Sequence, residues 1–167
     1  TYFKQLFAQV TNPAIDPIRE KVVMSLDSFI GAQKNVLDET PEHCHRIHVK
    51  NPVLTSQEYK NLRDIKEKGF KTKVISTLQF PSSQPPISNF FAATLDELCK
   101  QAEAAIEEGY TFIALSDRGV SENKIAIPAL LACGAVHQYL VKKSIRSQIG
   151  IIVDSGEPRE VHHFALL

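Results

Sequence analysis

From residue 55 to the end of the chain, amphipathic helix patterns alternate with short, uninterrupted apolar runs. The runs at 73–78, 111–115 and 148–153 are rich in β-branched residues, which is typical of strands buried on both faces. Helix patterns lie between them, so the order over residues 55–167 is α-β-α-β-α-β-α. This alternation predicts an α/β fold, a parallel sheet with covering helices. It leaves open whether the βα units form a partial barrel or an open three-layer sheet.

Local signals predict where the helices begin and end. Capping-box patterns start two of them, at Thr55–Glu58 and Thr94–Glu97. We expect the first helix to end at Gly69 and the second at Gly109, because glycine commonly follows the last helical residue. A third helix is predicted from Pro128, and a short fourth one follows the last strand.

The first part of the chain is less regular. Residues 1–54 are predicted to be an irregular, helical N-terminal segment, and residues 55–167 the βα-repeat part of the same domain. A helix is expected over about 17–29, because Asp16 and Pro17 suit an N-cap and a first helical position. The chain begins with threonine and closes on an apolar stretch, so we expect it to be a fragment of a larger polypeptide.

Composition argues against two classes of partner. The 19 basic residues balance the 19 acidic ones, so no net field draws the chain to nucleic acid or to an anionic membrane. The apolar runs are also far shorter than the roughly 20 residues that cross a bilayer. Three widely spaced cysteines fit reduced thiols in a cytosol-like compartment. We therefore expect no nucleic-acid partner and no membrane partner.

Polar residues follow two of the predicted strands. Asp117 and Arg118 come after the run 111–115, and Asp154 and Glu157 come after the last strand. Parallel strands end at one edge of a sheet, where α/β folds place ligands, so these loops should lie side by side. Asp117 could act as a base and Arg118 could bind a carboxylate or phosphate. The alternative, which we favour, is that these residues hold the loops and cap a helix.

One short loop contains side chains of the metal-binding type, namely His43, Cys44, His45 and His48. Their spacing is poor, because a structural zinc site would need all four ligands from this one loop. We expect a solvated loop and no bound metal.

Covalent catalysis has weak support. Cys99 and Cys133 fall on apolar helix faces, where a free cysteine behaves as a small hydrophobe. Cys44 is expected to be exposed, with no visible orienting group. No glycine-rich phosphate loop or nucleophile elbow occurs in the chain. The chain alone therefore predicts no catalytic residues and no cofactor site.

Three stretches carry a similarity to a known family: residues 7–26, 115–131 and 154–167. The first opens with Phe-Ala-Gln-Val-Thr-Asn-Pro-Ala-Ile-Asp-Pro, the second with Leu-Ser-Asp-Arg-Gly, and the third with Asp-Ser-Gly-Glu. In this order they resemble blocks of the central domain of glutamate synthase. The similarity spans residues 1–167 but only part of that domain.

The resemblance implies a role inside a larger oxidoreductase. In that family an amidotransferase domain hydrolyses glutamine, ammonia travels inside the protein, and an FMN domain combines it with 2-oxoglutarate to give glutamate. The catalytic cysteine would lie upstream, and the FMN and iron-sulfur sites downstream. Thr11 and Asn12 become candidate tunnel or interdomain residues. The parent would be cytoplasmic, or plastid-located if it is a plant-type ferredoxin enzyme.

A second functional class stays open. The chain could be an independent α/β domain that binds a small molecule at the C-terminal ends of its strands, through the loops at Asp117 and Asp154.

Overall fold

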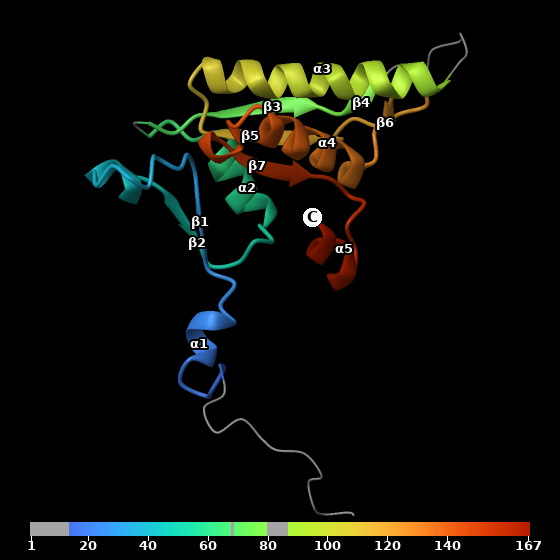
Figure 1. Cartoon of the computed structure of the whole chain (residues 1–167). Coiled ribbons are helices and arrows are strands. Elements are labelled where there is room, and N and C mark those ends of the chain that lie inside the picture. Colours follow the sequence, from blue (N-terminus) through green and yellow to red (C-terminus); the bar gives the residue numbers. More distant parts are fainter. Residues whose placement is uncertain (1–13, 68, 80–86) are drawn as a thin grey trace, which may run out of the picture.

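Three parallel strands form the central sheet, in the order β3-β5-β7 (Figure 1). The computed structural model describes residues 14–67, 69–79 and 87–167. β3 (Thr72–Ser76), β5 (Phe112–Ser116) and β7 (Gly150–Asp154) lie close to the predicted runs. The predicted parallel α/β sheet is confirmed. Within the described residues, the three strands of this sheet do not close into a barrel.

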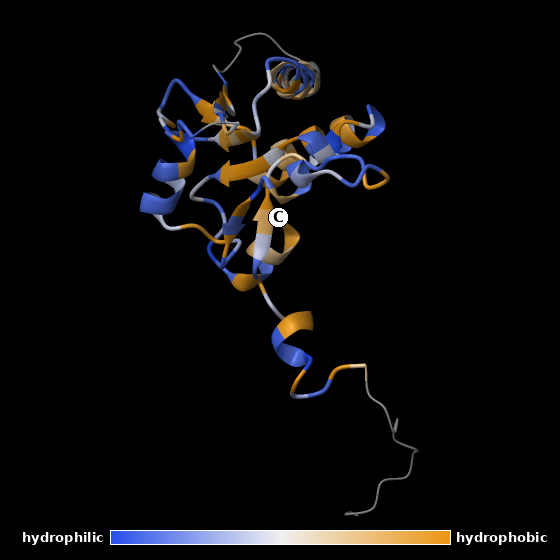
Figure 2. Ribbon diagram, turned by 90° about the vertical axis from the view of Figure 1, so that its left-hand side faces the viewer, coloured by the Kyte–Doolittle hydropathy of each residue, from blue (hydrophilic) through white to orange (hydrophobic). Residues whose placement is uncertain are grey.

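Strand β5 lies in the middle of this sheet, and all of its residues are buried. Ile113 and Leu115 face one side and belong to the main hydrophobic core. Phe112 and Ala114 alternate with them and face the other side, because successive side chains of a strand point to opposite faces. Figure 2 shows hydrophobic residues concentrated on the strands of the sheet.

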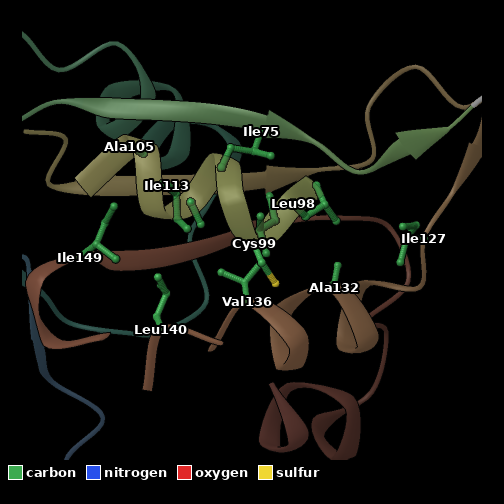
Figure 3. Close-up of a cluster of buried hydrophobic side chains, with 12 residues drawn as sticks. Ile75, Leu98, Cys99, Ala105, Ile113, Ile127, Ala132, Val136, Leu140 and Ile149 are labelled. Carbon is green, nitrogen blue, oxygen red and sulfur yellow. The ribbon is translucent and has the colours of Figure 1, made fainter. Parts of the chain in front are cut away.

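Helices α3 (Ile87–Glu107) and α4 (Ala129–Lys142) cover one face of the sheet. They connect β3 to β5 and β5 to β7, and crossovers of the same hand place both helices on the same face. Figure 3 shows the core they form with the strands, whose buried members are Ile75, Leu98, Cys99, Ala102, Ala105, Ile113, Leu115, Ile127, Ala132, Val136, Leu140 and Ile149.

The opposite face is covered by α2 (Ser56–Arg63) and by a hairpin of β1 (Ser28–Ile30) and β2 (Ile47–Val49). The Thr72 hydroxyl in β3 donates to the Leu62 carbonyl at 2.6 Å, which ties α2 to the sheet. The Phe70 ring stacks on Phe112, with ring centroids 6.1 Å apart. This second layer places α2 beside the strand ends that form the candidate site.

The remaining elements are short. They are α1 (Glu20–Val23), the 3-10 helices η1 (Pro41–Cys44) and η2 (Arg146–Gln148), the antiparallel pair β4 (Leu78–Gln79) and β6 (Ile125–Ala126), and α5 (Val161–Leu166). Within the described ranges, none of the helices has the length and apolar character needed to span a bilayer. The division of the chain at residue 54 stays a prediction.

The predicted helix over 17–29 is wrong. Asp16 does accept from the N–H groups of Ile18 and Arg19, at 2.8 and 2.9 Å, so the expected helix start is present. The helix itself is only α1, and Ser28 already belongs to β1. Ile18 and Val22 are 85% and 78% exposed. An isolated helix without a packed apolar face is marginal in water, which explains why it stops after one turn.

Two other predicted helix boundaries differ from those in the structure. The Thr55–Glu58 capping box is present, but its helix ends at Arg63 rather than at Gly69. The Thr94–Glu97 pattern is not a helix start, because Thr94 lies inside α3 and is buried. The apolar stripe of α3 extends upstream of this pattern, and burial of that stripe outweighs the local capping signal.

A glycine in β7 provides a test of this packing. A Cβ atom added at Gly150 would lie 2.7 Å from Cδ1 of Phe112, a fully buried ring. We therefore expect Gly150→Ala to lower the free energy of unfolding by about 1–3 kcal/mol, the usual cost of overpacking a core. Urea denaturation followed by circular dichroism measures the change.

Gly134 in α4 offers a matched control, because an added Cβ there meets no atom within 4 Å. Gly134→Ala should stabilise the fold by about 0.5–1 kcal/mol, since alanine is the better helix former. Equal stability changes in the two variants would contradict the packing described for Phe112.

Candidate functional site

Polar side chains gather where β5 and β7 end, and α2 adds one from the covering layer. We call this group the strand-end cluster; it consists of Tyr59, Ser116, Asp117, Arg118, Asp154 and Ser155. The parallel register puts Ser116 opposite Asp154, so the two loops leave the sheet side by side. The sequence-predicted residues Asp117, Arg118 and Asp154 therefore meet in one place.

The Asp154 carboxylate is the centre of the cluster. Its Oδ2 accepts a hydrogen bond from the Arg118 Nε at 2.7 Å and another from the Ser116 hydroxyl at 2.9 Å. The Asp154 side chain is 11% exposed, whereas that of Arg118 is 66% exposed. The Arg118 guanidinium also lies 5.9 Å from the centre of the Tyr59 ring. The ion pair thus joins a nearly buried anion to a cation at the surface.

These contacts determine the protonation of Asp154. Burial by itself would raise the pKa of its carboxyl group, but hydrogen bonds from Arg118 and Ser116 and the nearby Tyr59 hydroxyl outweigh burial and lower it. Burial and the Asp154 carboxylate raise the pKa of Tyr59 to about 12. At neutral pH, Asp154 is therefore an anion and Tyr59 is a neutral phenol. A carboxylate stabilised in this way is a poor proton acceptor.

Asp117 and Glu157 belong to the same two loops but make other hydrogen bonds. The Asp117 Oδ2 accepts from the Ser155 hydroxyl at 2.6 Å, and its backbone N–H donates to the Asp154 carbonyl at 3.2 Å. Glu157 accepts from the backbone N–H of Ala129 at 2.7 Å, at the start of α4. These hydrogen bonds orient and fix the loops. Among the described residues, Asp117 contacts the hydroxyl group of Ser155 and no histidine or carboxyl group with which it could exchange a proton.

Sequence reasoning missed three members of the cluster, Tyr59, Ser116 and Ser155. Tyr59 comes from the covering helix α2, and no local signal in the sequence indicates its polar neighbours. For Ser116 a signal exists: in a parallel sheet with this register, the last residue of β5 lies opposite the last residue of β7.

The histidines near residue 45 separate in the structure. The His43 Nε2 lies 2.7 Å from the Asp38 carbonyl oxygen. His45 stacks on Phe70, with centroids 4.3 Å apart, and the His48 Nε2 lies 3.2 Å from Asp27. Among the residues that the structure describes, no group of His, Cys, Asp and Glu side chains could hold a metal ion.

The cysteines lie in different environments. Cys99 is buried and Cys133 is half-buried, and burial raises the pKa of both thiols. Cys44 is exposed. A raised pKa disfavours the thiolate, so neither helical cysteine is an activated nucleophile.

The candidate tunnel residues Thr11 and Asn12 lie outside the described residues.

Comparison with known proteins identifies the family. The glutamate synthase central domain family matches residues 1–167. The chain belongs to this family. Over its length the central domain is 42% identical to glutamate synthase [NADH] of Schizosaccharomyces pombe and 42% identical to the glutamate synthase [NADPH] large chain of Bacillus subtilis. It is 39% identical to the chloroplastic ferredoxin-dependent glutamate synthase of Oryza sativa subsp. japonica.

These relatives are much longer than the central domain described here. Each alignment covers 99% of this chain, but only 8% of the fission-yeast protein and 10% of the bacterial and rice proteins. The chain therefore corresponds to a small part of each synthase.

The strand-end cluster gives a stability prediction. Asp154→Asn removes the charge that Arg118 and Ser116 stabilise, so we expect the free energy of unfolding at pH 7 to fall by about 1–3 kcal/mol. Because the pKa of Asp154 is lowered by folding, its contribution is present above the unfolded-state pKa, about 3.9. It is lost as the pH falls through the lower, folded-state value. Urea titrations at several pH values should show the two proteins converging in acid.

Asp64 serves as the matched control. It forms an exposed ion pair with the neighbouring Arg63 at 2.8 Å, and exposed pairs contribute little. Asp64→Asn should leave the unfolding midpoint nearly unchanged. If Asp154→Asn behaved in the same way, the cluster would not hold the loops together.

Proposed function

We propose that this chain is the central linking domain of a glutamate synthase, where it connects a glutamine amidotransferase site to an FMN synthase site. In this role it contributes to the passage of ammonia between them during glutamate biosynthesis. One observation carries the proposal: the family match runs over all 167 residues, yet these correspond to only 8–10% of the related synthases. A small segment that matches the central-domain family of a large enzyme suits a linking role.

The surface of the domain supports contact with other parts of a polypeptide. Several large apolar side chains are strongly exposed, among them Val36 (87%), Leu37 (85%), Ile18 (85%) and Val161 (86%). Covering such side chains in an interface removes their apolar surface from water, which is favourable. The amidotransferase and FMN-binding domains of the same polypeptide are the partners we propose.

The chemistry of the described residues supports an assignment of catalysis to those other domains. The strand-end cluster uses its polar groups internally, and the Cys99 and Cys133 thiols have raised pKa values. We propose that the FMN and the iron-sulfur cluster lie outside this chain and that the parent enzyme is an oxidoreductase. It would work in the cytoplasm, or in a plastid if its electron donor is ferredoxin.

Thr11 and Asn12 are the residues that we propose to lie near the ammonia route. Small polar side chains suit such a route, because they exchange hydrogen bonds with neutral ammonia without trapping it as an ion. In the intact synthase, Thr11→Leu should leave glutamine hydrolysis in place but reduce the glutamate formed per glutamine consumed, with free ammonia appearing in solution. An assay that measures all three compounds together tests this.

Thr40→Leu is a suitable control, because Thr40 is an exposed threonine in a loop remote in sequence from this segment. It should leave the product ratio unchanged. A ratio that stays at the wild-type value in Thr11→Leu would remove the channelling role from this segment. An isolated chain that is purified yellow, with bound FMN, would contradict the placement of the cofactor in another domain.

A further inference from the structure

A cavity runs along the outer edge of β7. Within the described part of the chain, β7 pairs with β5 on one side only. The space beside its other edge has a volume of about 760 Å³ and is lined by residues of β7, α4, α5, α2 and the segment around β1 and β2. This volume falls in the range of small-molecule sites. On the α4 side the walls are mainly apolar, with Leu130, Ile151, Val153 and Phe164.

Arg146 lines this cavity just before the start of β7. Two hydrogen bonds hold its guanidinium in place: the Nε donates to the His137 Nδ1 at 3.0 Å, and the Nη1 donates to the Ile149 carbonyl at 2.7 Å. The Nη2 group has no hydrogen-bond partner among the described residues. The guanidinium is therefore positioned, with donors left for a further acceptor.

The charge of Arg146 is also unmatched. No carboxylate of the described residues forms an ion pair with it. The group is half-buried, and burial lowers its pKa, which reflects the cost of removing the cation from water. The other charged residues that line the cavity, Arg118 and Asp154, already pair with each other. One positive charge thus remains without a counterion among the described residues, in a cavity lined by both apolar and polar side chains.

The hydrogen bond from Arg146 to His137 also determines the charge of the His137 ring. Because the Nδ1 atom accepts from Arg146, the ring proton must be on Nε2 and the imidazole is neutral while the bond exists. The site then carries a single positive charge, which matches a carboxylate better than a phosphate dianion. A planar carboxylate also fits the two-pronged geometry of a guanidinium.

We propose that Arg146 and the β7-edge cavity bind a carboxylate attached to an apolar body. The carboxylate accepts from the free donors of Arg146, and the apolar body lies against Ile151 and Val153. The carboxylate comes either from a free small molecule or from an Asp or Glu side chain of an adjoining polypeptide segment. The cavity also reaches the strand-end cluster, but Arg146 makes none of that cluster's contacts. The proposed site does not depend on the linking role.

Hexanoate is the probe for the test, because it combines a carboxylate with an apolar chain. We expect it to bind the 167-residue chain, as measured by calorimetry and by shifts of the His137 imidazole signals in ¹⁵N-labelled protein. Hexanamide, which lacks the charge, and acetate, which lacks the apolar chain, should each bind at least about tenfold more weakly.

Variants locate the binding. Arg146→Gln should weaken hexanoate binding by about tenfold or more, whereas Arg19→Gln, a change at an exposed arginine, should leave it unchanged. His137→Gln keeps the charge of Arg146 but removes the ring that positions it, so it should weaken binding less than Arg146→Gln does. It also provides a second test if Arg146→Gln fails to fold. Equal binding of hexanoate and hexanamide, wild-type affinity in the Arg146 variant, or no hexanoate binding would overturn the proposal.

The intact protein distinguishes the two sources of the carboxylate. If an acidic side chain of another segment fills the site, hexanoate binding that depends on Arg146 should be present in the 167-residue chain and lost in the intact protein. If the natural ligand is a free carboxylate, the intact protein should keep it. Both results support a carboxylate at Arg146.

Discussion

Strand β5 lies between two parallel neighbours and is covered on both faces, so each of its backbone groups is paired and each of its side chains is removed from water. Helices α3 and α4, which connect β5 to its two neighbouring strands, pack on one face of the sheet. Helix α2 and the β1–β2 hairpin cover the other face. The strand-end cluster depends on this sheet, because the register opposite β7 brings Ser116 to Asp154. Without this pairing, the polar loops would have no common edge.

The sheet, α2 and α4 could be predicted because buried elements have characteristic patterns of apolar residues in the sequence. Strands covered on both faces read as continuous apolar runs, and β5 is an example. The openness of the sheet could not be predicted, since both crossover helices lie on the same face, as they would in a barrel. The predicted N-terminal helix was wrong for a related reason. Periodic apolar residues indicate a helix only if another surface covers them, and Ile18 and Val22 remain exposed.

The candidate site was predictable in part. Asp117, Arg118 and Asp154 follow strands, and the rule that parallel strands end at one edge suffices to bring them together. Tyr59 comes from a covering helix whose position over the sheet depends on tertiary packing. His137 and Arg146 belong to different elements and meet only because η2 turns the chain back toward α4. No spacing rule indicates such a pair, and it became visible only through the contacts of the guanidinium.

The contact between Glu157 and the start of α4 has a consequence for the order in which the protein forms. Pro128, at the N-cap position, provides no side-chain acceptor, so the Ala129 N–H is satisfied by a carboxylate 28 residues further along the chain. A ribosome synthesises the helix well before this carboxylate. The Ala129 N–H therefore gains this acceptor only after the chain beyond β7 has been synthesised. Docking of the last strand thus also brings the acceptor to the start of α4.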